Sequence, residues 1–179
     1  MRLNILWPLL LVTTTAYAQP ALNALQERAE AALVANQPDQ TVRLAGQMLD
    51  AQPDSFAALY LLALAQADLN DLQMAAQTGA RAYAVATTED RQFQAARFVG
   101  GVRFRAMQYT RSEVWLRRAA NHAQTDAERQ SVAAAFAASK QANPLSIRFA
   151  GSVAPTDNVN NGSEDGVLRL EGIDVTFVL

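Results

Sequence analysis

The sequence predicts a mainly α protein: an array of about seven helices paired into hairpins, followed by one or two β-strands. Three observations predict this fold class. Apolar residues recur at steps of three and four over residues 20–142, and polar or proline-containing segments break the pattern at short, regular intervals. Alanine, the best helix former, supplies 36 of the 179 residues. After Asn143 and Pro144 the apolar residues recur at every second position, which is typical of strands.

The composition narrows the class of function. Half of the chain is hydrophobic and its net charge is −2, which argues against disorder and against the basic surface of a nucleic-acid-binding protein. The lack of cysteine excludes disulfides and cysteine-based zinc sites, and a single histidine, His122, excludes a multi-histidine metal site. No phosphate-binding loop or nucleophile motif occurs. We therefore expect no enzyme activity, no cofactor and no metal.

Residues 1–18 have the features of a secretory signal peptide. Arg2 provides the positive start, an apolar run follows it, and Ala16-Tyr17-Ala18 has the small-x-small pattern that signal peptidase recognises. The run from Leu3 to Val12 is about half the length needed to span a bilayer. We expect an exported chain that begins at Gln19; a buried N-terminal helix is the alternative.

Breaks in the apolar pattern separate the helices expected in a domain over residues 19–142. The breaks lie near residues 36–39, 52–55, 70–71, 87–90, 105–108 and 123–125. Either Asp54 or Ser55 is suited to cap the third helix, and the segment Thr125–Glu128 resembles the start of the seventh.

Small residues mark a repeating unit in this domain. Ala29 and Ala63 are 34 positions apart, and Gly100 follows after 37, so an insertion of three residues is expected near Thr87–Asp90. Paired helices with this period resemble the tetratricopeptide repeat. Gly79 departs from that pattern, because a bulky residue is usual there. Small residues let helix axes approach closely, and each hairpin buries its apolar stripe against its neighbour. A plain helical bundle is the alternative.

The segment 143–179 is expected to begin a β-barrel or to form a terminal β-hairpin. Apolar residues alternate over 145–153 and again over 173–179, and a turn-rich loop over 155–166 separates them. Alternation over 7 to 10 residues is typical of outer-membrane barrel strands, and also of any half-buried hairpin. The acidic and amide residues after Asp157 do not have EF-hand spacing, since Val159 and Leu168 occupy ligand positions. We expect a loop there rather than a calcium site.

The junction of the two parts carries a second resemblance. It rests on Trp115–Ala123 and on Asn143–Ser146 leading into Ala154–Ser163. These segments resemble outer-membrane proteins of the surface lipoprotein assembly modulator type. The resemblance implies a periplasmic tetratricopeptide domain, a C-terminal transmembrane β-barrel, and a role in delivering lipoproteins to the cell surface. A closed barrel needs at least eight strands, and at most two fit after Leu145, so we expect the chain to be truncated after the first barrel strands.

The repeat register places four candidate partner-binding residues on first helices of the hairpins: Tyr60, Arg97, Phe104 and Arg105. Aromatic and arginine side chains are frequent interface anchors, so this set favours a protein or peptide client, with a lipoprotein as one candidate. Arginines are also dense in the third repeat, where they form either a basic wall or a solvated helix face: Arg91, Arg97, Arg103, Arg105, Arg111, Arg117 and Arg118. His122, at a helix end, is expected to act as a favourable C-terminal cation.

Two functional hypotheses follow from these observations. The first is the periplasmic protein-binding repeat domain of an outer-membrane protein that assembles or translocates surface lipoproteins. The second is a free periplasmic tetratricopeptide scaffold whose terminal strands pack as a hairpin. An enzymatic hypothesis has no catalytic residues to support it. The sequence does not identify the client.

Overall fold

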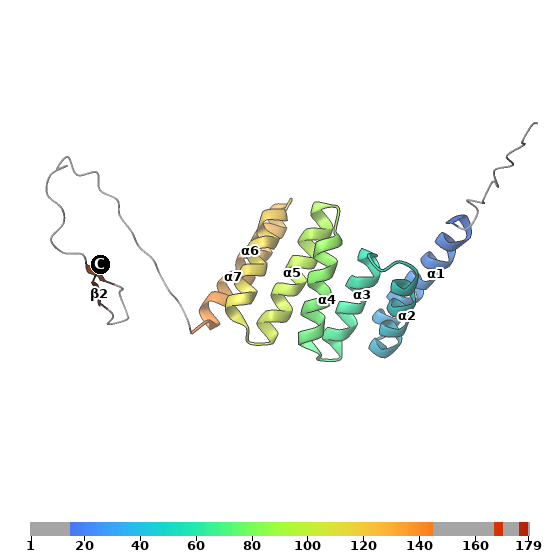
Figure 1. Ribbon diagram of the computed structural model, residues 1–179, viewed down its shortest axis with the longest axis horizontal. Coiled ribbons are helices and arrows are strands. Elements are labelled where there is room, and N and C mark those ends of the chain that lie inside the picture. Colours follow the sequence, from blue (N-terminus) through green and yellow to red (C-terminus); the bar gives the residue numbers. More distant parts are fainter. Residues whose placement is uncertain (1–14, 145–166, 170–175, 179) are drawn as a thin grey trace, which may run out of the picture. The chain divides into compact units, whose positions relative to one another are not determined.

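Within residues 15–144 the protein forms seven α-helices that stand side by side in chain order (Figure 1). The structure is a computed structural model, and it describes residues 15–144, 167–169 and 176–178. The helices are α1 (Thr15–Val34), α2 (Pro38–Ala51), α3 (Phe56–Asp68), α4 (Leu72–Val85), α5 (Glu89–Arg105), α6 (Tyr109–His122) and α7 (Asp126–Ala142). The expected helical array is confirmed. None of the described helices is long and apolar enough to cross a membrane.

The turns inside the three hairpins are identical in length and in hydrogen bonding. Each contains three residues and one residue with positive φ: Asn36 at 54°, Asn70 at 61° and Met107 at 58°. In each turn the following N–H donates to a carbonyl five positions earlier, at 2.9, 2.9 and 2.8 Å, which is the Schellman closure of a helix C-terminus. These three positions are separated by 34 and 37 residues, which are the same spacings as those between Ala29, Ala63 and Gly100 in the sequence.

The insertion in the third repeat forms an additional helical turn. Helix α3 has 13 residues and α5 has 17, whereas the preceding helices α2 and α4 both have 14. The loop before α5 has three residues and the loop before α3 has four. The difference of three residues therefore lies in the first turn of α5, where Thr88 caps the helix by accepting from the N–H of Arg91. The extra turn places Glu89 and Asp90 at the N-terminal end of α5.

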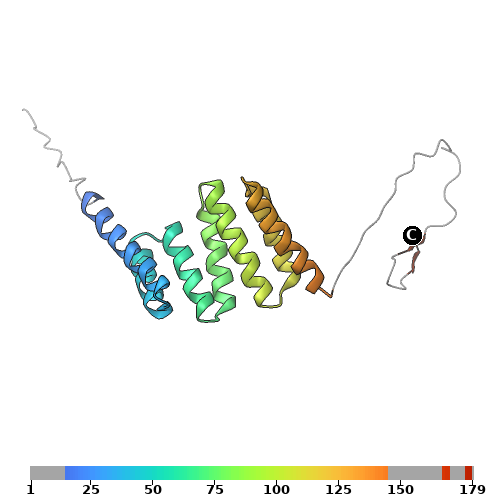
Figure 2. The ribbon, with the colours of Figure 1, turned by 180° about the vertical axis from the view of Figure 1, so that it is seen from behind.

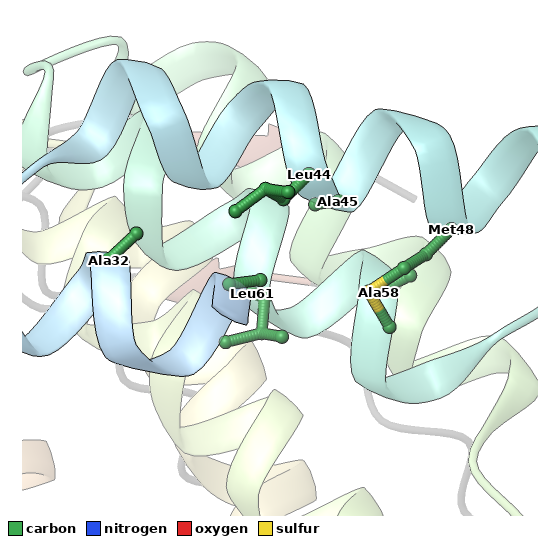
Figure 3. Close-up of a cluster of buried hydrophobic side chains, with 7 residues drawn as sticks. Ala32, Leu44, Ala45, Met48, Ala58 and Leu61 are labelled. Carbon is green, nitrogen blue, oxygen red and sulfur yellow. The ribbon is translucent and has the colours of Figure 1, made fainter. Parts of the chain in front are cut away.

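Small side chains allow close contact within and between the hairpins. The carbonyl of Ala29 accepts from the Thr41 hydroxyl at 3.5 Å, and the carbonyl of Gly100 accepts from the Ser112 hydroxyl at 2.8 Å. Both bonds join a first helix to the buried hydroxyl of its second helix, twelve residues on. Thr41 and Ser112 therefore satisfy their hydroxyl groups in the core. Figure 3 shows one core cluster, in which side chains of α1, α2 and α3 meet: Ala32, Leu44, Ala45, Met48, Ala58 and Leu61.

The packing around Gly79 explains why glycine occupies a position where the repeat pattern usually has a bulky residue. A Cβ at this position would lie 2.8 Å from Cγ2 of Val99 and 2.9 Å from Cδ1 of Phe98. Both side chains belong to α5, so the space that a bulky residue of α4 usually fills is filled from the next repeat.

The array curves toward its first helices. Consecutive members of the series α1, α3, α5 and α7 approach to within 8 Å between Cα atoms, whereas among the described residues no Cα atoms of α2 and α4, or of α4 and α6, lie that close. The first helices therefore lie closer together than the second helices do, and the row of helices can be followed from both sides in Figures 1 and 2. The side of the array formed by the first helices is its inner face.

Helix α7 closes the array at its C-terminal end. Thr125 and Glu128 form a complete capping box: the Thr125 hydroxyl accepts from the N–H of Glu128, and the Glu128 carboxylate accepts from the N–H of Thr125. The hydroxyl of Ser139, which is fully buried, donates to the carbonyl of Tyr109 at 3.2 Å. This bond fixes α7 against the first turn of α6.

The C-terminal segment forms a separate compact unit over residues 145–179. Two short strands are described, β1 (Val167–Arg169) and β2 (Thr176–Val178), and they pair antiparallel with Leu168 opposite Phe177. Strand β2 covers three residues of the strand expected over 173–179, whereas β1 was not expected. The strand expected over 145–153 and the loop over 155–166 lie outside the described residues, so the β-barrel remains a prediction.

Candidate functional site

One face of α5 is open along the whole helix. Residues at steps of four and three share a face of an α-helix, and this stripe runs through Asp90, Gln94, Arg97, Gly101 and Phe104. All of these residues are exposed or half-buried, whereas the neighbouring positions of α5 carry its core residues. The stripe therefore faces the inner side of the array and lies outside the core of the described helices.

A pocket of about 450 Å³ lies over Gly101, at the middle of this stripe. A Cβ at Gly101 would meet no heavy atom within 4 Å, so the pocket floor is open. Its lining residues come from three helices: from α5 Arg97, Phe98, Gly100, Gly101, Val102, Phe104 and Arg105, from α6 Ser112 and Leu116, and from α7 Ala135 and Ala138. The walls are largely apolar, and the two guanidinium groups are the charged groups of this lining.

Both arginines of the pocket make contacts with other helices. The Nε–H of Arg97 donates to the Ser131 hydroxyl of α7 at 3.0 Å, and Nη2 of Arg105 donates to the carbonyl of Ala67 in the last turn of α3 at 3.2 Å. Arg105 thereby caps α3, because cations and N–H donors stabilise the unpaired carbonyls of a helix C-terminus. A guanidinium has five N–H donors, and these bonds use one donor in each group.

The aromatic candidates lie on two sides of α5. Phe104 is 38% exposed and packs edge-on against Tyr109, with ring centroids 5.5 Å apart. Tyr60 belongs to α3; it stacks on Phe56 at 5.6 Å and meets Phe98 edge-on at 5.7 Å. Phe98 also lines the pocket over Gly101. The structure thus brings three of the four sequence-predicted residues into one pocket and connects Tyr60 to it through Phe98.

Tyr60 itself lines a second hollow of about 350 Å³, which lies between α1, α3 and α5. Acidic and amide side chains surround this hollow: Glu30 and Gln26 on α1, and Asp90 and Gln94 on α5. Each amide donates to its acidic neighbour at 2.8 Å. Burial raises the pKa of the Tyr60 hydroxyl; the positive charge of Arg97 lowers it and the negative charge of Asp90 raises it. Tyr60 therefore lies between the two charged regions.

The arginines of the third repeat do not form one surface, so the basic wall, one of the two alternatives for them, is not present as a single face. Arg97 and Arg105 line the pocket on the inner face, but the guanidinium groups of Arg117 and Arg118 lie over the rings of Phe136 and Trp115, at 5.3 and 4.4 Å. Arg103 and Arg111 both donate to the side-chain carbonyl of Gln108, and the guanidinium of Arg91 lies 5.2 Å from the Phe56 ring centroid. The charges face in different directions because α5 and α6 pack back to back, so the basic density of the sequence is divided among separate contacts.

His122 ends α6, as expected, and connects three helices. Its Nδ1 contacts the carboxylate of Glu89, the first residue of α5, and its Nε2 lies 2.9 Å from the hydroxyl of Tyr83 on α4. Both ring nitrogens are therefore engaged in contacts between α4, α5 and α6. Among the described residues, no group of three acidic or histidine side chains is arranged to hold a metal ion.

Sequence reasoning missed most of the pocket lining, including Gly101 and Phe98. The repeat pattern identifies Gly100 but gives no role to Gly101, and it does not indicate Phe98 as the connection to Tyr60. The seven-residue steps from Asp90 to Arg97 and from Arg97 to Phe104 are the signal in the sequence that identifies the open stripe.

Comparisons with known proteins identify the fold. No family model matches the chain, and no curated protein matches it. Similar solved structures include the tetratricopeptide repeat domain of Sgt2 from Aspergillus fumigatus, with a TM-score of 0.60, 18% identity, and coverage of 78% of this chain and 93% of that one. The first such domain of human RPAP3 has a TM-score of 0.55 at 17% identity, covering 67% and 95%. MamA has a TM-score of 0.53 at 14% identity, covering 70% and 81%. Residues 15–144 therefore have the tetratricopeptide-like helical repeat fold.

Proposed function

We propose that this chain is a non-catalytic protein-binding module whose inner face holds an extended segment of a client protein. The observation that carries the proposal is the pocket over Gly101. It combines an open floor, apolar walls formed by Phe98, Phe104 and Leu116, and guanidinium groups at its edge. A pocket of this kind suits an apolar client side chain next to a carboxylate, because an apolar anchor provides affinity and a charge-assisted hydrogen bond provides orientation.

The two kinds of contact are expected to act on different properties of binding. Exposed ion pairs contribute up to about 1 kcal/mol each, so Arg97 affects mainly the association rate and its dependence on salt. An anchor buried among the aromatic and aliphatic walls contributes about 2 kcal/mol or more.

A steric block at Gly101 tests this function without removing any packing contact. We would select binders from a random 12-residue peptide library with the full chain and measure their affinities by fluorescence anisotropy. Gly101→Leu fills the open floor and should weaken selected peptides by about tenfold or more. Gly46→Leu is the matched control, since Gly46 is also a helical glycine with no heavy atom within 4 Å of an added Cβ, but it lies on α2.

A charge reversal tests the role of Arg97 separately. Arg97→Glu should slow association and reduce its salt dependence, whereas Arg43→Glu, the same change on α2, should not. If no peptide is selected, or if selected peptides bind wild type and Gly101→Leu equally, the inner face is not the binding surface.

The narrower proposal places this module in the periplasm, as part of an outer-membrane protein that assembles or translocates surface lipoproteins. It is supported by the sequence resemblance over 115–123, 143–146 and 154–163. Export is supported by the leader-like segment 1–18 and by Pro20, which is an interior residue of α1 as described. Interior proline costs a helix about 3 kcal/mol. Cleavage before Gln19 would place Pro20 in the first helical turn, where proline is favoured.

Two measurements test the narrower proposal. N-terminal sequencing of the exported protein should find Gln19 first. The chain 19–179 should need detergent and fractionate with outer membranes, whereas the chain 19–144 should not, because barrel strands expose apolar side chains and unpaired edges in water. Equal solubility of both chains, with recovery of both from the periplasm, would instead favour the free scaffold.

A further inference from the structure

The inner face of the array has two charged ends of opposite sign. The pocket over Gly101 is lined by the guanidinium groups of Arg97 and Arg105. The hollow beside Tyr60 is lined by the carboxylates of Glu30 and Asp90 and by one guanidinium, Arg91, which lies over the ring of Phe56. The first region is therefore net positive and the second net negative.

The order of charges along α5 is only partly explained by the stability of the helix itself. Acidic residues at the N-terminus and basic residues at the C-terminus stabilise a helix through its dipole, which accounts for Asp90 and Arg105. It does not account for Arg97, which lies in the middle of α5, nor for Glu30, which belongs to α1 and faces the same hollow as Asp90. Side chains of two helices thus create the negative end.

Aromatic rings connect the two ends. Tyr60 lines the negative hollow, Phe98 lines the positive pocket, and their rings meet edge-on at 5.7 Å. A ligand that occupies both ends therefore passes over apolar surface between them.

The carboxylates of the negative end retain acceptor capacity. Glu30 and Asp90 each accept one amide N–H, from Gln26 and Gln94. A carboxylate has about four acceptor sites. The side-chain ammonium of a lysine in this hollow, with three donors, can therefore donate to a carboxylate there without displacing the amides.

The length of α5 sets the spacing of the ligand. Asp90 and Gly101 are eleven positions apart, which corresponds to about 16 Å along a helix axis. An extended chain advances about 3.3 Å per residue, so about five residues cover this distance.

Given the proposed function, we propose that the inner face binds an extended client segment with one basic and one acidic residue about five positions apart. The basic side chain lies in the hollow lined by Glu30 and Asp90, and the acidic side chain lies in the pocket over Gly101, which Arg97 and Arg105 line. The charge arrangement thus defines the class of client that the module accepts and the direction in which it lies.

Synthetic peptides test this pairing directly. We would titrate the full chain with acetylated, amidated 12-residue peptides of identical composition, each with one lysine, one glutamate and one leucine beside the glutamate. The lysine and glutamate are separated by two, five or eight positions, in both orders. Fluorescence anisotropy should give the tightest binding for a separation of five in one of the two orders, by about three- to fivefold over the other separations.

A thermodynamic cycle identifies the site of the lysine. Replacing the peptide lysine by alanine should weaken binding to wild type about three- to fivefold and should not change binding to Glu30→Gln/Asp90→Asn. Glu27→Gln/Asp50→Asn is the matched control with the same change of charge, because both residues are exposed and neither lines the hollow. This control should respond to the lysine as wild type does.

Three outcomes would overturn the inference. They are equal binding at all separations, an equal effect of the lysine in wild type and in Glu30→Gln/Asp90→Asn, and loss of the lysine effect in the control. The proposed function would still stand in each case if the glutamate-containing peptides bind wild type but do not bind Gly101→Leu. If none of the peptides binds wild type, both proposals are wrong.

Discussion

Gly100 and Gly101 show how much one position along a helix changes the role of a residue. A Cβ at Gly100 would lie 2.8 Å from Cδ2 of Leu116 and 2.9 Å from its Cγ, whereas a Cβ at Gly101 would meet nothing within 4 Å. Adjacent helical positions differ in direction by about 100°, so one glycine faces α6 and the other faces the pocket. Close helix packing requires only Gly100.

The first prediction compares alanine at these two positions. Gly101→Ala should stabilise the domain by about 0.5–1 kcal/mol, because alanine loses less conformational entropy in a helix. Gly100→Ala gains the same amount from helix propensity but forces Leu116 to move, and overpacking costs about 1–3 kcal/mol. Chemical denaturation measures both free energies of unfolding. Equal stabilisation of the two variants would show that Leu116 does not contact Gly100 in solution.

The second prediction concerns the hydroxyl of Tyr60. Burial raises its pKa, so the hydroxyl should ionise above the usual tyrosine range, and the associated stability is present at neutral pH and lost as pH rises through the raised pKa. Asp90→Asn should lower this pKa, because it removes the negative charge that raises it. Arg97→Gln should raise this pKa, because it removes the positive charge that lowers it. Ultraviolet titration of each variant, with Tyr60→Phe as the reference, measures the change. Identical titration curves for both variants would contradict the placement of Tyr60 between the charged regions.

At the scale of elements, the turns inside the hairpins are more alike from one repeat to the next than the helices are. All three turns use one residue in the left-handed region, but the third turn uses methionine where the others use asparagine. Asparagine tolerates this region better than methionine, and methionine at position 107 is 76% exposed. Its side chain therefore contributes little that would offset the strain.

The third prediction replaces this residue by the one used in the other turns. Met107→Asn should raise the stability of the domain by about 0.5–1 kcal/mol, because it reduces the cost of positive φ without removing the N–H bond to Phe104. The reverse change, Asn70→Met, should lower stability by a similar amount. Thermal unfolding measures the change in stability of each variant. If both variants are stabilised, or both are destabilised, the three turns do not share the same conformational requirement.

The fourth prediction concerns the capping box of α7. Backbone N–H bonds from Thr125 and Gln124 lower the pKa of Glu128 below the usual carboxyl range. A lowered pKa contributes stability above the ordinary pKa of the group and loses it as pH falls through the lowered value. The start of α7 should therefore lose amide protection below about pH 4, the ordinary range of glutamate. Hydrogen exchange of Glu128→Gln, which should lack most of this pH dependence, provides the comparison.

At the scale of the whole chain, two compact units divide the protein at residue 144. The array of residues 15–144 has its own core clusters, which run from α1 to α7 through successive hairpins. Such arrays are stabilised by each hairpin and its neighbour. We therefore expect the array to be stable without the segment 145–179.

The fifth prediction is that the chain 19–144 folds by itself. It should be monomeric, should have a far-ultraviolet spectrum dominated by helix, and should unfold at the same temperature as the helical part of the chain 19–179. Circular dichroism and sedimentation measure these properties. A spectrum dominated by strand, or a large loss of thermal stability relative to the longer chain, would show that the terminal segment is needed for the array.

Much of the fold is determined by local features that the sequence displays. The apolar periodicity places the seven helices, Ser55, Thr88 and Thr125 cap three of them, and the spacing of Ala29, Ala63 and Gly100 gives the repeat register. The periodicity and the caps act between residues that are close in the sequence, and the register is a regular spacing along it, so all three can be recognised without a structure. The register in turn placed Tyr60, Arg97, Phe104 and Arg105 on the first helices.

Only the tertiary structure decided which of these residues share a site. Arg97, Phe104 and Arg105 meet over Gly101 because α6 and α7 close the other sides of the pocket, and Tyr60 faces a hollow completed by α1. The arginines of the third repeat are divided among several contacts because two helices that are adjacent in sequence pack with their outer faces turned apart. Helix periodicity determines which face each side chain occupies, but contacts between helices determine which faces remain open, and those contacts join residues that are far apart in the sequence.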